Sequence, residues 1–283
     1  MLERSSLLGF STLSGRVGLV LFLAFCLIAL LAPALAPLDP LAINYDDAGT
    51  IQRMQAPGGG YPLGTNYYGR DILSQIILGS RVSIGVGLLS ALIIVFIGAN
   101  IGLIAGYSGG RVDAVLMRLT DIAFGIPFFP FAVLLVALLE PSIWNMIITI
   151  SCLLWRSVAR VVRSQVLSLR ERPYVRAAQV AGASNLRVMY IHILPNIMPM
   201  VLLYTAIGIA YAVLSEASLS FLGFGDPTAI SWGSMLYDAY VTGSISRAWW
   251  WTIPPGVCIT LFVISVFLMA RDWELIANPR LAR

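Results

Sequence analysis

The chain has 283 residues, of which 58% are hydrophobic and only 11% are charged, whereas about a quarter of an average soluble domain is charged. So few charges cannot cover a water-soluble protein of this size, which excludes a soluble fold and favours an all-α polytopic membrane protein. The net charge of +4 rests on 18 arginines, because the sequence contains no lysine. A P-loop needs a lysine after its glycines, so the chain cannot carry a standard ATP-binding site.

Six apolar runs are long enough to cross a bilayer, and we expect each to form a transmembrane helix. They cover residues 17–37, 82–106, 115–139, 143–162, 197–214 and 251–270. The first run is longer than the h-region of a signal peptide, which has about 7–15 residues, so we expect it to remain as an uncleaved span. Terminal segments occupy residues 1–16 and 273–283, and polar loops occupy residues 38–77 and 215–248.

Two of these runs carry features that predict how their helices pack. The second has glycines four residues apart, a spacing that lets another helix approach closely; they are Gly98, Gly102 and Gly106. In the third, Arg118 and Asp121 can pair because they are three residues apart. Pro127 and Pro130 predict a kink in the same run.

The distribution of arginine predicts the orientation of the chain. Six spans place both termini on one side of the membrane, and fourteen of the 18 arginines fall in segments on that side. The other four are Arg53, Arg70, Arg81 and Arg247. By the positive-inside rule, both termini are therefore expected in the cytoplasm.

The segment 173–195 is polar and lies between two apolar runs, on the predicted cytoplasmic side. Pro173 suits the first position of a helix, and Gly182 suits its end. One face of that helix carries Arg172, Arg176 and Gln179. Ser184 can cap a second short helix that runs to Pro195. We call this segment the elbow; its pattern suits either a docking element for a partner or an ordinary interfacial loop.

The sequence predicts neither a catalytic residue nor a metal site. Ser108 lies in a Gly-x-Ser-x-Gly pattern, but that nucleophile motif needs a preceding strand, and a spanning helix precedes it here. His192 is the only histidine and has no second histidine with which to share a metal. The cysteines lie in three different apolar runs, without a metal-ligand spacing or a disulfide pattern; they are Cys26, Cys152 and Cys258.

Ionisable residues deep within a span would indicate an ion or proton pathway. Glu140 and Glu216 lie near outer ends of runs, so the usual signature of an ion-coupled carrier is missing and the source of energy is expected outside this chain. A cluster of arginines ends the fourth run, and it could contact a cytoplasmic partner or lipid headgroups; its members are Arg156, Arg160 and Arg163.

Several motifs in order along the chain resemble one known family. In the elbow, Ala177 and Ala178 followed by Gly182 and Leu194-Pro195 are similar to the EAA signature of bacterial ABC importer permeases. Further stretches resemble the dipeptide/oligopeptide/nickel permeases and their second, C-type subunit. These stretches are residues 61–74, 79–87, 219–225, 231–236, 250–256 and 278–280.

The resemblance implies a type I ABC importer permease with its core at residues 78–272 and a coupling loop at 163–196 that docks on an ATPase subunit. The coupling-loop positions are Tyr174, Val175, Arg176, Ala177, Ala178, Gly182, Ala183, Ser184 and Arg187. The family's outer-segment motif falls on Gly64, Thr65, Gly69, Arg70, Asp71, Gly79 and Arg81. Arg176 stands where the signature usually has an acidic residue, so the ion pair of that residue cannot be carried over.

The partners implied are a second homologous permease, two ATPase subunits that bind ATP and Mg²⁺, an external solute-binding protein and the lipid bilayer, with no nucleic acid and no cofactor on this chain. The location implied is the cytoplasmic membrane of a bacterium or archaeon. The predicted function is one half of the solute pathway of an ATP-driven importer for dipeptides or oligopeptides. Oligosaccharides or a metal chelate are alternative cargoes, and an ion-coupled secondary carrier is the alternative from another class.

The segment 231–240 has apolar residues at helical spacing within the last outer loop. They are Trp232, Met235, Leu236, Ala239 and Tyr240. A helix with this pattern could lie flat on the outer face of the membrane or plug an outer gate, and flat is the simpler reading.

Overall fold

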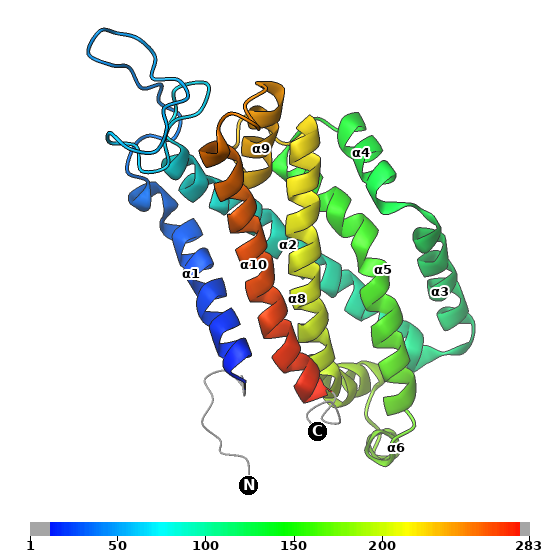
Figure 1. The fold of residues 1–283 in the computed structure, drawn as a ribbon. Coiled ribbons are helices and arrows are strands. Elements are labelled where there is room, and N and C mark those ends of the chain that lie inside the picture. The colour runs from blue at the N-terminus through cyan, green and yellow to red at the C-terminus, as the bar shows by residue number, and fades with distance from the viewer. Residues whose placement is uncertain (1–11, 278–283) are drawn as a thin grey trace.

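The computed structural model describes residues 12–277 and consists mainly of long helices that lie side by side (Figure 1). Five helical segments are long and apolar enough to cross a membrane, and a bent pair of helices makes a sixth. The main helices are α1 Leu13–Leu35, α2 Ile72–Ser108, α5 Ile143–Leu169, α8 Leu194–Leu219 and α10 Trp249–Ala277. The expected all-α polytopic fold is confirmed. Expectations for residues 1–11 and for the closing motif at 278–280 lie outside the described residues.

Several helices extend beyond the apolar runs that predicted them, and α2 does so by the most residues. α2 begins at Ile72, ten residues before the run at 82–106, because Asp71 caps it by accepting a hydrogen bond from the Ser74 N–H at 2.8 Å. The added turns carry polar side chains that are buried in protein, where hydropathy gives no signal. α5 likewise continues past residue 162 to Leu169.

The third run bends at Pro127, as predicted, but much more sharply than a kink within one helix. It breaks into α3 Gly110–Gly125 and α4 Phe128–Leu138, which are bent by 86°. Pro127 supplies no N–H to continue the helix, and the Arg156 guanidinium of α5 donates to the carbonyls of Ala123 and Ile126 beside the break. Arg156 therefore holds this break instead of contacting a lipid headgroup or a partner.

The other charges near this break also pair differently from the prediction. Asp121 accepts a hydrogen bond from Arg160 at 2.9 Å, and Arg118 makes no ion pair within residues 12–277, so the expected Arg118–Asp121 pair is wrong. Arg163 binds Asp113 of α3 through two hydrogen bonds, one of them 2.6 Å long. The spacing rule failed because Arg160 of α5, on the neighbouring helix, pairs with Asp121 in place of Arg118.

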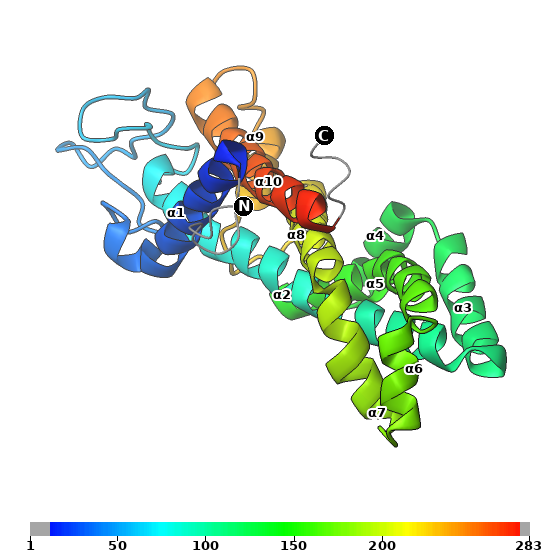
Figure 2. The same cartoon turned by 90° about the horizontal axis from the view of Figure 1, so that it is seen from below.

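Helix α2 is the centre of the bundle and packs against α5 and α8 (Figures 1 and 2). Its glycine stripe faces α5: a methyl group on Gly102 would lie 2.5 Å from the Ala159 carbonyl oxygen, and one on Gly98 would lie 2.6 Å from that of Trp155. The predicted close helix–helix approach is confirmed.

The elbow contains α6 Pro173–Val180, α7 Asn185–Arg187 and a π-helical stretch, η2 Val188–Ile193. The expected second short helix does not end at Pro195, since the chain stays helical from Asn185 to Phe224. Pro195 lies in the first turn of α8, directly after the π-helical stretch. Proline has no N–H to donate to the carbonyl four residues earlier, and the wider hydrogen-bond spacing of the π-helical stretch does not need that bond. The elbow is thus joined to the fifth span without a break.

Helix α9 Trp232–Val241 follows a π-helical stretch, η3 Ser220–Phe224, at the end of the molecule opposite the elbow, which we call the outer end. It packs against α10, α2 and α8, and Trp232, Met235 and Ala239 are buried within the protein. The Trp232 indole N–H donates to the Ile76 carbonyl at 3.0 Å. The part of this face that carries Trp232, Met235 and Ala239 therefore packs on other helices, whereas Tyr240 is exposed.

Candidate functional site

The elbow lies at the end of the molecule where α1 begins and α10 ends (Figure 1). Seen from that end, α6 and α7 lie together at the edge of the bundle away from α1 (Figure 2). Val175 is fully buried in one hydrophobic cluster with Val166 of α5 and Val188 of η2. This contact anchors α6 to α5, which precedes the elbow, and to the π-helical stretch within the elbow.

Tyr107, near the end of α2, ties the two arms of the elbow together. Gln179 of α6 donates to the Tyr107 hydroxyl at 3.2 Å, and that hydroxyl donates to the Asn185 side chain of α7 at 3.0 Å. The sequence singled out Gln179 as a member of a polar face but did not predict Tyr107 or Asn185. Both arms are therefore attached to the central helix of the bundle as well as to each other.

The predicted coupling positions divide into anchors and exposed residues. Val175 is buried and Ala178 and Ala183 are half-buried, whereas the exposed positions are Tyr174, Arg176, Ala177, Gly182, Ser184 and Arg187. The most exposed apolar side chains of the elbow are Val180 at 89% and Leu186 at 66%, and neither was predicted. Large apolar side chains left this open at the tip of an anchored element indicate a surface for a partner.

Gly182 has the role expected from its turn. Its φ is +84°, the left-handed region that favours glycine, and the Ser184 side chain caps α7 by accepting from the Arg187 N–H at 3.4 Å. A methyl group at Gly182 would meet no atom of this chain within 4 Å. The backbone conformation, and not a close approach inside the chain, therefore requires glycine here.

Arg176, whose charge departs from the family signature, finds its partner within the elbow. Its guanidinium donates to the Glu171 carboxylate at 2.6 Å, and Arg170 contacts the same carboxylate at 3.3 Å. The Arg176 hydrogen bond is the main reason that the pKa of Glu171 lies below its usual value. No acidic partner surface is needed to satisfy Arg176.

At the outer end, most of the predicted outer-segment motif builds the loop that precedes α2. Gly64 and Gly69 have φ values of +73° and +77°, and Thr65 is buried with its hydroxyl donating to the Gln52 carbonyl at 2.6 Å. Asp71 caps α2. These residues hold the outer loop against the bundle, so their role in the structure is architectural.

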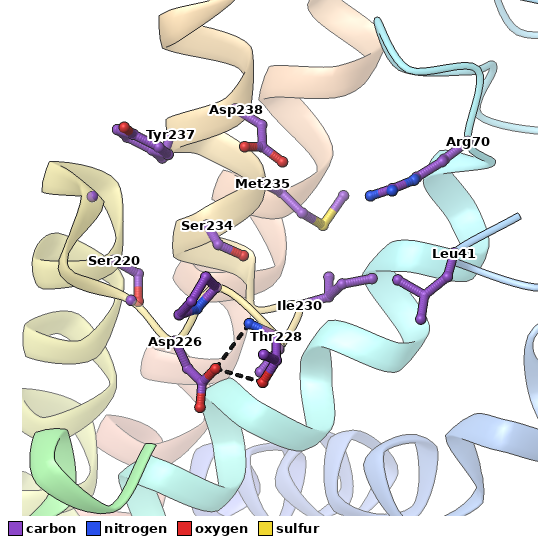
Figure 3. A pocket seen from close by; sticks show the side chains of 14 residues that line it. Leu41, Arg70, Ser220, Asp226, Thr228, Ile230, Ser234, Met235, Tyr237 and Asp238 are labelled. Atoms are coloured by element: carbon purple, nitrogen blue, oxygen red, sulfur yellow. Dashed lines mark hydrogen bonds between the residues drawn. The ribbon is translucent and has the colours of Figure 1, made fainter. Parts of the chain in front are cut away.

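The two arginines of the motif instead line two adjoining cavities at the outer end. Arg70 lines a cavity of about 260 Å³ between the outer loop and the segment 220–238 (Figure 3). Arg81 lines a cavity of about 390 Å³ between the outer parts of α2 and α5. Leu41 and residues 228–230 border both cavities.

The Arg70 cavity, as we call the first of these, holds charges of both signs. Figure 3 shows Arg70 entering from the outer loop, Asp238 from α9 and Asp226 from the loop before α9. Asp226 is already hydrogen-bonded to the N–H and hydroxyl of Thr228, at 2.9 and 2.6 Å. The Asp238 carboxylate makes no hydrogen bond or ion pair within the described residues, and burial raises its pKa while Arg70 opposes that rise. Arg70 stacks over Tyr68 at 5.7 Å.

Glu216 is buried beside these cavities, a position that its place at the end of an apolar run did not reveal. Its carboxylate accepts hydrogen bonds from the hydroxyls of Ser83 at 3.0 Å and Ser220 at 2.7 Å. Ser83 in turn accepts from the Trp232 N–H at 3.1 Å. This network joins α2, α8 and α9 and serves their packing.

A groove of about 450 Å³ lies between α5 and α8, with α2 as its floor. Its walls carry three hydroxyls, on Ser157, Tyr204 and Tyr211, which have no hydrogen-bond partner in the chain as described. The hydrocarbon core of a bilayer offers no partner for a hydroxyl, so a groove with these groups at that depth suits a path that polar solute or water can enter.

The described residues show no group of three or more histidine, cysteine or acidic side chains that could hold a metal ion. Ser108 is the last residue of α2, so a helix precedes it and the geometry of a nucleophile elbow is absent at that residue.

Comparison with known proteins yields one consistent result. Residues 98–281 match the family described as "Binding-protein-dependent transport system inner membrane component". The chain is 37% identical over 268 residues to the dipeptide transport system permease protein DppC of Haemophilus influenzae, covering 94% of this chain and 90% of that protein. It is 36% identical over 270 residues to the di/tripeptide transport system permease protein DppC of Pseudomonas aeruginosa, covering 94% and 88%. For the oligopeptide transport system permease protein OppC of Bacillus subtilis the identity is 34% over 252 residues, covering 88% and 81%.

Proposed function

The chain belongs to the family of binding-protein-dependent transport system inner membrane components, and from that premise we propose that it forms half of the solute pathway of an ATP-driven importer of short peptides. Members of this family are permease components of ABC importers, in which ATPase activity lies in separate subunits and a substrate-binding partner supplies the solute. The relatives named for dipeptides and oligopeptides support peptides as cargo. A second homologous permease and two ATPase subunits that bind ATP and Mg²⁺ complete the proposed assembly.

The observation that carries the proposal is the elbow. It is anchored to α2 and α5 on one side and exposes Val180 and Leu186 on the other. Because the helix that leaves the elbow is continuous from Asn185 to Leu219, a displacement of the elbow tilts a whole wall of the bundle. A chain without lysine has no P-loop of its own, so this is where energy from a partner ATPase enters.

The proposed cycle has three steps. ATP closes the partner ATPases, and their approach shifts the elbow. The shift turns α8 relative to α5, so that the groove holding Tyr204 and Tyr211 changes from inward-facing to outward-facing and accepts peptide from the binding protein. Hydrolysis then returns the helices to the inward-facing arrangement.

Uptake by the complete transporter tests the function. The permease pair, its ATPases and its binding protein are reconstituted in liposomes, and entry of radiolabelled Ala-Ala is measured with ATP and Mg²⁺ on the ATPase side. We expect uptake with ATP and none with a non-hydrolysable analogue. Uptake by this chain alone, driven by an ion gradient and indifferent to ATP, would show a secondary carrier instead. ATP-driven entry of an oligosaccharide or a nickel chelate without entry of peptide would contradict the proposed cargo.

A further inference from the structure

The Arg70 cavity has an arrangement of charge that the architecture of the outer end does not explain. Glu216 lies on a nearby element and receives hydrogen bonds from two serine hydroxyls, as a buried carboxylate requires. Asp238 receives none from residues 12–277, although it is half-buried. The Arg70 Nε atom is likewise buried without a partner in that part of the chain.

The two groups have opposite charges and line the same cavity, yet they form no ion pair with each other. A direct pair would be the simplest way to satisfy both, since charge-assisted hydrogen bonds are the strong ones. Instead both side chains line the cavity of about 260 Å³ without a direct hydrogen bond between them (Figure 3). An anion alone would leave Asp238 without a partner, and a cation alone would leave Arg70 without one. A ligand with both charges satisfies both.

We propose that the Arg70 cavity is a binding site for a zwitterionic short peptide, with the peptide carboxylate on Arg70 and its ammonium group on Asp238. The inference rests on the proposed peptide import and adds a stopping place at the outer end. The cavity volume is close to the lower limit of ligand pockets, about 300 Å³, so it suits a dipeptide. The guanidinium is a planar donor that can bind a carboxylate through two parallel hydrogen bonds.

The neighbouring cavity gives the site a direction. It shares Leu41 and residues 228–230 with the Arg70 cavity and is otherwise lined mainly by apolar side chains of α2 and α5, with Arg81 at its edge. A peptide held by its two ends in the first cavity lies next to this second one, which leads along α2. The outer site therefore selects for free peptide ends before the solute passes between the helices.

The test measures binding without the solute-binding protein, whose own preference for peptide ends would obscure the result. The purified permease–ATPase complex in lipid nanodiscs is titrated with Ala-Ala, N-acetyl-Ala-Ala and Ala-Ala amide, and contact is read by saturation-transfer difference NMR. For the unaltered complex we expect Ala-Ala to bind at least about tenfold more tightly than either blocked peptide, since a charge-assisted pair is lost with each block.

Two variants assign the charges. Arg70→Gln is expected to weaken the binding of Ala-Ala about tenfold and to leave the binding of Ala-Ala amide unchanged. Asp238→Asn is expected to weaken the binding of Ala-Ala about tenfold and to leave the binding of N-acetyl-Ala-Ala unchanged. Arg53→Gln is the matched control, because Arg53 stacks over the adjacent Tyr67 at 5.2 Å but does not line the cavity. It should bind all three peptides like the unaltered complex.

Equal binding of free and blocked peptides by the unaltered complex would overturn the inference, as would an absence of Ala-Ala binding. An equal loss of all three peptides in both variants would also overturn it and would assign Arg70 and Asp238 to packing. The blocked peptides need no variant, so misassembly of a variant does not prevent the test. ATP-driven uptake without this binding would contradict the binding site but not the proposed importer function. Binding without ATP-driven uptake would contradict the proposed function.

Discussion

At the scale of single residues, Arg176 departs from the family signature, and a neighbouring side chain compensates its charge. Arg176 pairs with Glu171 across the turn that begins α6, so the elbow keeps its conformation without an acid at position 176. Because the pKa of Glu171 is lowered in the folded chain, the pair contributes above the usual pKa of glutamate and is lost as the pH falls through the lowered value. Both side chains are exposed, so the contribution of the pair to stability is small.

Gly182 carries the sharpest prediction at this scale. Gly182→Val forces a β-branched residue into a positive φ, which costs roughly 1–2 kcal/mol, whereas Gly182→Asn puts a residue there that tolerates this region. We expect Val to lower both dipeptide uptake and the ATPase rate stimulated by the binding protein, and Asn to preserve most of both. If Val leaves coupling unchanged, the elbow is not the lever. If Asn fails together with Val, contact with the ATPase and not the backbone conformation decides.

At the scale of helices, apolar runs located the spans but not their ends. The outer turns of α2 carry buried serines and a glutamine, and the last turns of α5 carry arginines that α3 neutralises, so neither stretch is apolar enough to be recognised. In α2 these groups are satisfied by the outer loop or by their own helix, whereas Arg163 of α5 is satisfied by Asp113 of α3. The glycine stripe was predictable, because four-residue spacing places its members on one face whatever the partner is.

A pair of substitutions on α2 tests this packing. Gly102→Ala adds a methyl group 2.5 Å from the Ala159 carbonyl oxygen, so α5 must move, and we expect a loss of about 1–3 kcal/mol in stability. Gly85→Ala on the same helix meets no atom within 4 Å and should be neutral or slightly stabilising. Thermal unfolding in detergent, followed by tryptophan fluorescence, compares the two. Equal melting temperatures would mean that the stripe does not set the distance between α2 and α5.

At the scale of the whole molecule, the elbow and the cavities lie at opposite ends of the bundle and are joined by α2 and by the helix that runs from Asn185 to Phe224. The same α8 side chains that wall the groove lie on this helix, and Glu216 near its outer end is hydrogen-bonded to α2. Movement at one end is therefore mechanically connected to the other. The direction of transport depends on which end is cytoplasmic, which stays a prediction from arginine counts.

Cysteine labelling tests that orientation. In a variant whose three native cysteines are replaced by serine, Val180→Cys places a thiol on the elbow, where Val180 is 89% exposed, and Ala56→Cys places one on the exposed outer loop. A membrane-impermeant maleimide applied to intact spheroplasts should label position 56 alone and should label position 180 only after lysis. The reverse pattern would invert the topology and place the elbow out of reach of any ATPase.

The sequence by itself determined the class of the protein, its helices and the position of the elbow. Composition required a membrane, and Pro173, Gly182 and Ser184 marked the ends of the elbow helices through backbone rules that act within a few residues. It also gave the outer motif, though not the division of that motif into loop-building residues and cavity-lining arginines.

Only the tertiary structure decided which groups distant in sequence meet. The 86° break is held by Arg156 from another helix, Glu216 is satisfied by Ser83 of α2, and Arg70 shares a cavity with Asp238 of α9. Hydrophobic periodicity and helix spacing describe one element at a time, so they cannot say which element lies opposite a charge. The energy of a buried charge depends on the element that lies opposite it. The sequence could therefore locate the spans, whereas only the fold could locate the Arg70 cavity.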